Sequence, residues 1–224
     1  MRKRLTNICA LVLGAGLAGL FWGSSAQAAT EGPLTTTSPI PSTTTDWSSS
    51  LAFPQFNPSL GTLTSVEIYL SGGLTTQLTV TNNDESSSSY GTAKTEVQIS
   101  AQDVGSDLVV PELDMYSSPA FSYSLAAGGS IVSGLLTQTG TSDETYTSSP
   151  VLAEFTGVSS YSLPASTFTQ TVLSNTGGNT DASQVTTAYL TGSVTYTYSV
   201  PEPASLGLIV AALPLLAARR RRHA

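Results

Sequence analysis

Apolar and polar residues alternate along most of this chain, and that period of two narrows the possible folds more than any other feature. Val66, Ile68 and Leu70 alternate with Glu67 and Tyr69, and the pattern returns near residues 78–80, 97–101 and 194–198. A period of two turns one side of a strand to a core and the other to water. Apart from the two terminal segments, no window carries a sustained helical stripe. The chain is therefore expected to be all-β.

Glycine- and asparagine-rich stretches divide the alternating runs. Ser71-Gly72-Gly73 is expected to form a hairpin, because glycine accepts positive φ without penalty. Further breaks are expected at 82–85, 128–129 and 177–179. The expected strands cover residues 48–53, 62–70, 74–81, 92–101, 107–110, 119–125, 130–137, 151–156, 166–173 and 184–198, the last of them broken at Gly192. So many short strands predict an antiparallel two-sheet β-sandwich.

Charged residues are few and unevenly placed. Of the eight Lys and Arg, three lie at residues 2–4 and four at 219–222, which leaves Lys94 as the only cation between residues 29 and 200. Fourteen acids lie in the same stretch. Binding to a nucleic-acid backbone needs clustered cations, so we expect no nucleic-acid partner.

The first 28 residues are typical of a secretory signal peptide. Cationic residues 2–4 precede an apolar run from Ile8 to Trp22, which is short for a retained membrane helix. Ala26 and Ala28 form the small-x-small pattern that signal peptidase accepts, so cleavage is expected after Ala28. The only cysteine, Cys9, would leave with the signal helix, and the mature protein would have no disulfide.

The last residues, 200–224, form a second targeting pattern. After Pro201, Glu202 and Pro203 comes an uncharged, mostly apolar run from Ala204 to Ala218. As a helix this run would reach about 22 Å, against a hydrocarbon core of about 30 Å, so it is expected to be a short transmembrane helix. Four arginines follow and would keep that end in the cytoplasm, which leaves residues 29–200 outside.

Pro-Glu-Pro, a short apolar span and a final arginine cluster, in this order, resemble the PEP-CTERM sorting signal. The resemblance implies that the chain is exported, passes through the inner membrane transiently, and then reaches the cell surface or the extracellular matrix. It also implies processing by an exosortase, a membrane-embedded cysteine peptidase. The residues implied are Pro201, Glu202 and Pro203 as the recognition element and Arg219, Arg220, Arg221 and Arg222 as the stop signal.

The stretch between the two ends divides into a polar leader and a domain. Residues 29–45 are rich in Thr and Ser and form either a flexible leader or an irregular first strand. Residues 46–199 resemble the choice-of-anchor E domain, on the phrases at 53–63, 121–130 and 152–157. In the first phrase we expect Phe53 and Phe56 to be core anchors, residues 57–59 to form a turn, and Gly61 to occupy a tight backbone position.

The residue types of the domain exclude several kinds of catalysis. Residues 29–200 contain neither His nor Cys, so a Ser–His–Asp triad and a cysteine nucleophile are ruled out. Lys94 is expected to be a solvated lysine on an edge strand. Glycoside hydrolysis would need two carboxylates, and the candidate pairs are Asp84 with Glu85, Asp103 with Asp107, Glu112 with Asp114, and Asp143 with Glu144. Turn residues surround these acids, so we expect surface acids and no enzyme.

We expect no cofactor, although carboxylates and carbonyls in β-loops also suit Ca²⁺ and leave a calcium ion as an open alternative. The expected function is an exported, non-catalytic domain with a structural or adhesive role. The main alternative is a carbohydrate-binding module for the exopolysaccharide matrix, in which exposed aromatic rings stack on sugars. Trp47 is the first candidate contact, with Tyr69, Tyr90, Tyr116, Tyr146 and Tyr161 beside it.

Overall fold

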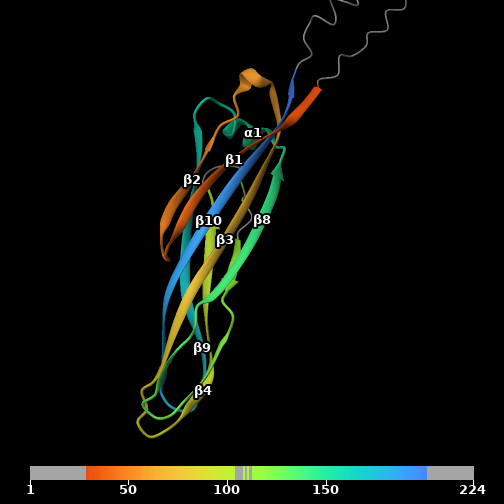
Figure 1. The fold of residues 1–224 in the computed structure, drawn as a ribbon. Coiled ribbons are helices and arrows are strands. Elements are labelled where there is room, and N and C mark those ends of the chain that lie inside the picture. The colour runs from red at the N-terminus through yellow and green to blue at the C-terminus, as the bar shows by residue number, and fades with distance from the viewer. Residues whose placement is uncertain (1–28, 104–107, 109, 111–112, 201–224) are drawn as a thin grey trace, which may run out of the picture.

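The computed structural model describes residues 29–103, 108, 110 and 113–200, and these form two antiparallel sheets that pack face to face (Figure 1). In sheet A, β10 lies between β1 and β3, and both β7 and β8 pair with the far edge of β3. In sheet B, β9 lies between β2 and β4, and both β5 and β6 pair with β4. The all-β, antiparallel two-sheet sandwich expected from the alternation is confirmed.

The described residues contain ten strands, one α-helix and one 3₁₀ helix. They are β1 (Ala29–Thr44), β2 (Ser48–Pro54), η1 (Pro58–Leu60), β3 (Thr62–Asn82), β4 (Ser89–Ala101), β5 (Leu113–Ser117), β6 (Phe121–Leu125), β7 (Ser130–Val132), β8 (Leu136–Tyr146), α1 (Ser149–Glu154), β9 (Ser160–Thr176) and β10 (Thr180–Val200).

The core between the sheets consists of two hydrophobic clusters. The larger cluster includes Phe53, Phe56 and Tyr196, and the smaller one includes Leu78 and Tyr123. Phe53 and Phe56 are fully buried, which confirms their predicted role as core anchors. Both clusters arise from inward positions of the alternating pattern, as the burial of every second residue in β4 illustrates.

Two glycine sites that the sequence assigns to chain breaks lie inside continuous strands. β3 runs through Gly72 and Gly73 without turning, and β10 runs through Gly192. The predicted hairpin at 71–73 and the predicted break at Gly192 are therefore wrong. The glycines serve packing instead: a Cβ on Gly72 would lie 3.0 Å from Ile99 Cδ1, and one on Gly192 would lie 2.7 Å from Leu51 Cδ1.

Three other expectations fail locally. Residues 151–156, predicted as a strand, fall largely in the helix α1, where Pro150 occupies the first turn. The predicted strand 130–137 is divided between β7 and the start of β8. In the predicted strand 107–110, the described residues Leu108 and Val110 are buried but lie outside any strand, and the strand that follows them, β5, was not predicted.

The polar stretch 29–45 belongs to the sandwich. Most of it is β1, which pairs with β10 from Ala29 opposite Val200 to Thr44 opposite Thr187. Of the two alternatives left open by the sequence, the structure has the strand. Sheet A therefore begins before residue 46, where the sequence placed the start of the domain.

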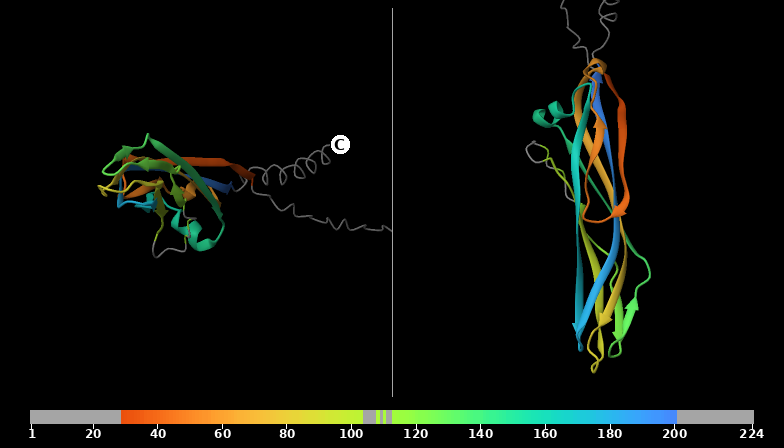
Figure 2. Two further views of the ribbon diagram at one scale, coloured as in Figure 1. Left: turned by 90° about the horizontal axis from the view of Figure 1, so that it is seen from below. Right: turned by 90° about the vertical axis from the view of Figure 1, so that its left-hand side faces the viewer.

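The sandwich is long and narrow (Figure 2). β3 and β10 each contain 21 residues, which corresponds to about 70 Å of extended chain. The register of β1 on β10 puts the start of β1 and the end of β10 at one end of the molecule. The turns between β3 and β4 and between β9 and β10 lie at the other end.

Candidate functional site

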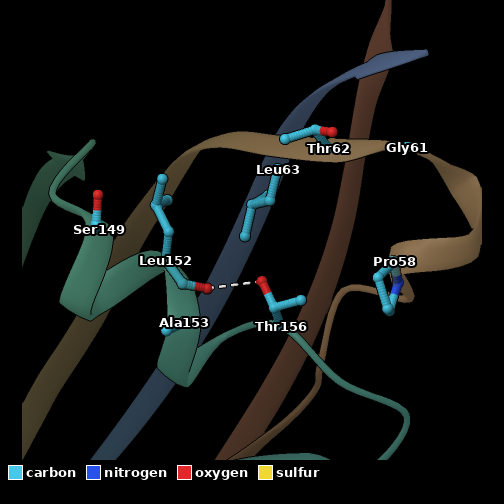
Figure 3. A pocket seen from close by; sticks show the side chains of 8 residues that line it. All are labelled: Pro58, Gly61, Thr62, Leu63, Ser149, Leu152, Ala153 and Thr156. Atoms are coloured by element: carbon cyan, nitrogen blue, oxygen red, sulfur yellow. Dashed lines mark hydrogen bonds between the residues drawn. The ribbon is translucent and has the colours of Figure 1, made fainter. Parts of the chain in front are cut away.

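A groove opens at the end of the sandwich where β10 finishes, between α1 and the junction of η1 with β3 (Figure 3). Its volume is about 580 Å³. Apolar side chains form most of its walls, and no charged residue is among them. The lining residues are Pro58, Gly61, Thr62, Leu63, Ser149, Leu152, Ala153 and Thr156.

The first wall of the groove is built by local sequence signals. The side chain of Asn57 accepts a hydrogen bond from the Ser59 amide at 3.0 Å, which caps η1, and Pro58 starts that helix. Gly61 then has φ of 153°, and a Cβ there would lie 2.3 Å from the Ser199 carbonyl oxygen. The turn at 57–59 and the tight position of Gly61 are thus as predicted.

The opposite wall is the helix α1. Ser148 is its N-cap residue and Pro150 lies in its first turn. At its end the Thr156 hydroxyl donates to the Leu152 carbonyl at 2.7 Å (Figure 3). The helix lies beside an open stretch of β3, because the pairing of β8 with β3 begins only at Val66. The groove fills the space that β8 leaves next to residues 62–65.

Two exposed aliphatic side chains lie beside the groove at the same end of the molecule. Leu60, the last residue of η1, is 45% exposed, and Val158, in the loop after α1, is 88% exposed. The loop that carries Val158 is held in place: the Gly157 amide donates to the Phe56 carbonyl, and the Gln55 amide donates to the Ser159 carbonyl, both at 2.9 Å. The sequence did not indicate the groove, although the Ser-Ser-Pro start at 148–150 is a recognisable helix signal.

Trp47, the predicted sugar contact, lies away from the groove and is partly buried. Its side chain packs against the larger core cluster, and its indole N–H donates to the Ala188 carbonyl at 3.3 Å.

The tyrosines that were named as further sugar contacts differ in exposure. Tyr161 is buried and its hydroxyl donates to Asp103, whereas Tyr69 and Tyr90 are exposed. Burial, followed by the nearby Glu144 carboxylate, raises the pKa of Tyr146 to about 12. The side chain of Tyr116 lies outside the described part of the chain.

The predicted acid pairs are not assembled around a cleft in the described residues. Asp84 accepts hydrogen bonds from the amides of Ser86 and Ser87, and these bonds lower the pKa of its carboxyl. Asp143 and Glu144 are adjacent exposed residues on β8, where successive side chains point to opposite faces. Asp107, Glu112 and the side chain of Asp114 lie outside the described residues.

Lys94 does not lie on an edge strand as expected. It is on β4, which has neighbours on both sides, and its ammonium group contacts Glu96 at 2.6 Å. The Lys94 contact and then the Gln170 amide hold the pKa of Glu96 below its usual range.

Within the described ranges, no three residues of the His, Cys, Asp and Glu types gather closely enough to hold a metal ion. The calcium alternative stays a prediction.

The targeting residues lie outside the described part of the chain. These are the signal residues Ala26 and Ala28 and the tail residues Pro201, Glu202, Pro203 and Arg219–Arg222. Over residues 29–200, apart from the few left undescribed near 104–112, the structure has no helix long and apolar enough to cross a membrane.

Comparisons with known proteins add little to this geometry. No protein-family model matches the chain. No curated protein matches it. Among solved structures, three viral proteins show a distant similarity: infectious bursal disease virus of the Gt strain (12% identity, TM-score 0.22, 96% of this chain and 53% of that one), the Gx strain (12%, 0.16, 92% and 52%) and the VP2 subviral particle of that virus (13%, 0.13, 96% and 54%). The chain spans about half the length of these proteins, and similarity this weak supports no conclusion.

Proposed function

We propose that this chain is an exported β-sandwich protein with a structural or adhesive role and no catalytic activity, held transiently at the inner membrane by its C-terminal segment and then sorted by an exosortase to the cell surface or the extracellular matrix. The sequence patterns at 1–28 and 200–224 are the basis for export and sorting. The proposal also assigns residues 1–28 as a signal helix and Ala204–Ala218 as a short transmembrane helix.

One structural observation carries this proposal. Ala29 pairs with Val200, so the two terminal segments join the sandwich at the same end. Until the signal segment is cleaved, a chain with both membrane-targeting segments at one end can hold both in one bilayer. The sandwich body, residues 29–200, then projects away from the membrane. With strands of about 70 Å, the opposite end would extend well beyond the head groups.

The composition of the body suits a non-catalytic role outside the cell. The outer face of sheet A carries mainly hydroxyl side chains, as in the rows Thr35–Thr195 and Ser71–Thr191. The groove has no carboxylate among its lining residues, so its geometry gives no support to glycoside hydrolysis. A surplus of acids keeps such a body soluble and repels other copies of it.

Carbohydrate binding is the second candidate, and the exposure of Tyr69 favours it. This side chain is 41% exposed on the outer face of sheet A, between Ser193 of β10 and Asp143 of β8. An open aromatic ring among hydroxyl and carboxylate groups is suited to stacking on a sugar. Loss of polysaccharide binding on Tyr69→Ala, with retention on Trp47→Phe, would assign the contact to this face.

The sorting proposal is tested by changing Pro201, Glu202 and Pro203 to alanine together. In the producing cells we expect this variant to accumulate in the inner-membrane fraction, because the recognition element is gone while the apolar segment remains. Ser205→Ala, a substitution in the same tail outside the motif, is the matched control and should be released like the wild type. Equal release of the triple variant would show that the sorting proposal is wrong.

A further inference from the structure

The tail leaves the sandwich on a very short tether. Only three residues, Pro201–Pro203, separate the last residue of β10 from the apolar run that starts at Ala204. Even a fully extended chain covers only about 14 Å over these four steps. If the tail sits in a bilayer, as the proposed function requires, this end of the sandwich must lie in or against the head-group layer.

Part of the surface at this end is apolar. The groove between α1 and η1 has Pro58, Leu63 and Leu152 in its walls, and Leu60 and Val158 protrude beside it. Gly61, next to Leu60, contacts the backbone of Ser199, and the ring of Phe56, next to the Val158 loop, lies 5.0 Å from the ring of Tyr198. These contacts tie the segments that carry both side chains to Ser199 and Tyr198, the first and second residues before Val200.

Charge does not explain an attraction of this end to lipid. Lys94 is the only cation of the body and pairs with Glu96 in the middle of sheet B. The acid in α1, Glu154, is partly buried. Contact with a membrane would thus depend on apolar burial, which is insensitive to salt and to the charge of the head groups.

We infer that this end of the sandwich seats on the lipid surface, with Leu60 and Val158 in the interfacial layer and the open groove facing the bilayer. The inference rests on the proposed function, because the tether brings the groove to the membrane only when the tail is inserted. It gives the groove an occupant, the lipid interface, and gives the body a fixed orientation upright on the membrane.

A matched control residue exists elsewhere on the molecule. Val185 is 72% exposed, similar to Val158, but it lies on β10 fifteen residues before Val200, which is about 50 Å along the strand. An upright body would hold Val185 far from the lipid. If solvent exposure alone determined contact with lipid, Val158 and Val185 would behave alike.

The test uses the full chain with Cys9→Ser and a single new cysteine, either Val158→Cys or Val185→Cys, labelled with an environment-sensitive fluorophore. Phosphatidylcholine vesicles should shift the emission of the label at 158 to the blue, and lipids with a quencher near the head groups should quench it. The label at 185 should show neither effect. High salt should leave both results unchanged.

A second measurement uses vesicle partition. Leu60→Asn combined with Val158→Asn should weaken binding of the full chain to vesicles about tenfold, because two aliphatic side chains would no longer be partly buried in the lipid interface. Val185→Asn should leave this binding unchanged. All three positions are exposed, so the substitutions leave the core intact.

The outcomes separate the inference from the function on which it rests. A chain that stays in solution with vesicles present would show that the tail does not anchor it, and both proposals would fail. A chain that binds vesicles while the label at 158 behaves like the one at 185 would overturn the seating alone. A label at 158 that is already shielded from water before vesicles are added would also overturn the seating, because another segment of the protein would then cover this end.

Discussion

Gly61 occupies a backbone position that leaves no room for a side chain. Its φ of 153° disfavours a side chain, and a Cβ would lie 2.3 Å from the carbonyl oxygen of Ser199 in the neighbouring strand. Because that oxygen belongs to backbone, it cannot move aside as a flexible side chain could. The close approach fixes where β3 begins and where the wall of the groove ends.

For Gly61→Ala we expect a loss of roughly 2–4 kcal/mol in the free energy of unfolding, measured in urea. Gly134→Ala is the control, since a Cβ at Gly134 meets nothing within 4 Å and no positive φ is involved. It should change stability by less than about 0.5 kcal/mol. Equal stabilities of the two variants would contradict the close approach.

Tyr196 makes stability depend on alkaline pH. Its ring is buried in the larger cluster and its hydroxyl donates to the Pro54 carbonyl at 2.8 Å, and burial raises its pKa to about 12. The unfolded chain would release this proton near pH 10, whereas the folded chain keeps it. The contribution is therefore complete below pH 10 and is lost as the pH rises toward 12.

We expect the free energy of unfolding to fall by up to about 1.4 kcal/mol per pH unit between pH 10 and 12 because of Tyr196. Tyr196→Phe removes the titrating group and should show a shallower decline over that window in urea titrations. At neutral pH the variant should be less stable by roughly 1 kcal/mol, since the hydrogen bond to Pro54 is lost. Parallel pH curves for both proteins would refute this role.

Three strands meet in a buried polar layer that separates the two hydrophobic clusters. The hydroxyl of Thr76 on β3 contacts that of Thr95 on β4 at 3.0 Å and that of Thr186 on β10 at 2.6 Å. All three residues are buried. Hydroxyl pairs of this kind link the two sheets and disfavour a slip in register, because a shifted strand would leave them unsatisfied.

A double-mutant cycle on Thr76→Val and Thr95→Val measures this layer. Thr76→Val should lose roughly 1–3 kcal/mol because the buried Thr95 hydroxyl loses this contact. Thr95→Val should lose less, because Thr76 keeps its contact with Thr186. The double variant should cost less than the sum of the two by about 1 kcal/mol. The exposed hydroxyl pair Thr35–Thr195, at 3.1 Å, is the control and should show a coupling near zero. Strict additivity at Thr76 and Thr95 would mean that the layer is not coupled.

The period-two pattern predicted most of the strands but not their ends. Val66, Ile68 and Leu70 alternate as expected, yet the strand continues through Gly72 because Ile99 and Leu113 fill the space above it. Local sequence cannot distinguish a glycine that turns the chain from one that makes room for a facing sheet. The groove was hidden for the same reason, since it depends on where β8 stops pairing with β3.

At the scale of the whole molecule, the uninterrupted strands determine the shape. β3 crosses the full length of the sandwich, so its two ends are at opposite ends of the body (Figure 2). The hairpin expected from the sequence would instead bring those ends together. The difference between the two arrangements is large enough to measure as a single distance.

Spin labels on Thr62→Cys and Thr81→Cys, in the full chain with Cys9→Ser, should lie about 60 Å apart by pulsed electron resonance, as expected for nineteen extended residues. The two positions point away from the core, so labelling should not disturb it. A short distance, with the labels about 5–10 Å apart, would mean that the chain folds back at Gly72-Gly73.

The proposal that the β-domain stands outside the cytoplasm can be decided in living cells with one cysteine. In producing cells that carry the Cys9→Ser, Val185→Cys chain, a membrane-impermeant maleimide should label the protein while the cells are intact, because Val185 is exposed and far from the membrane end. Labelling that appears only after the cells are lysed would place the domain in the cytoplasm, and export, sorting and membrane seating would all be wrong.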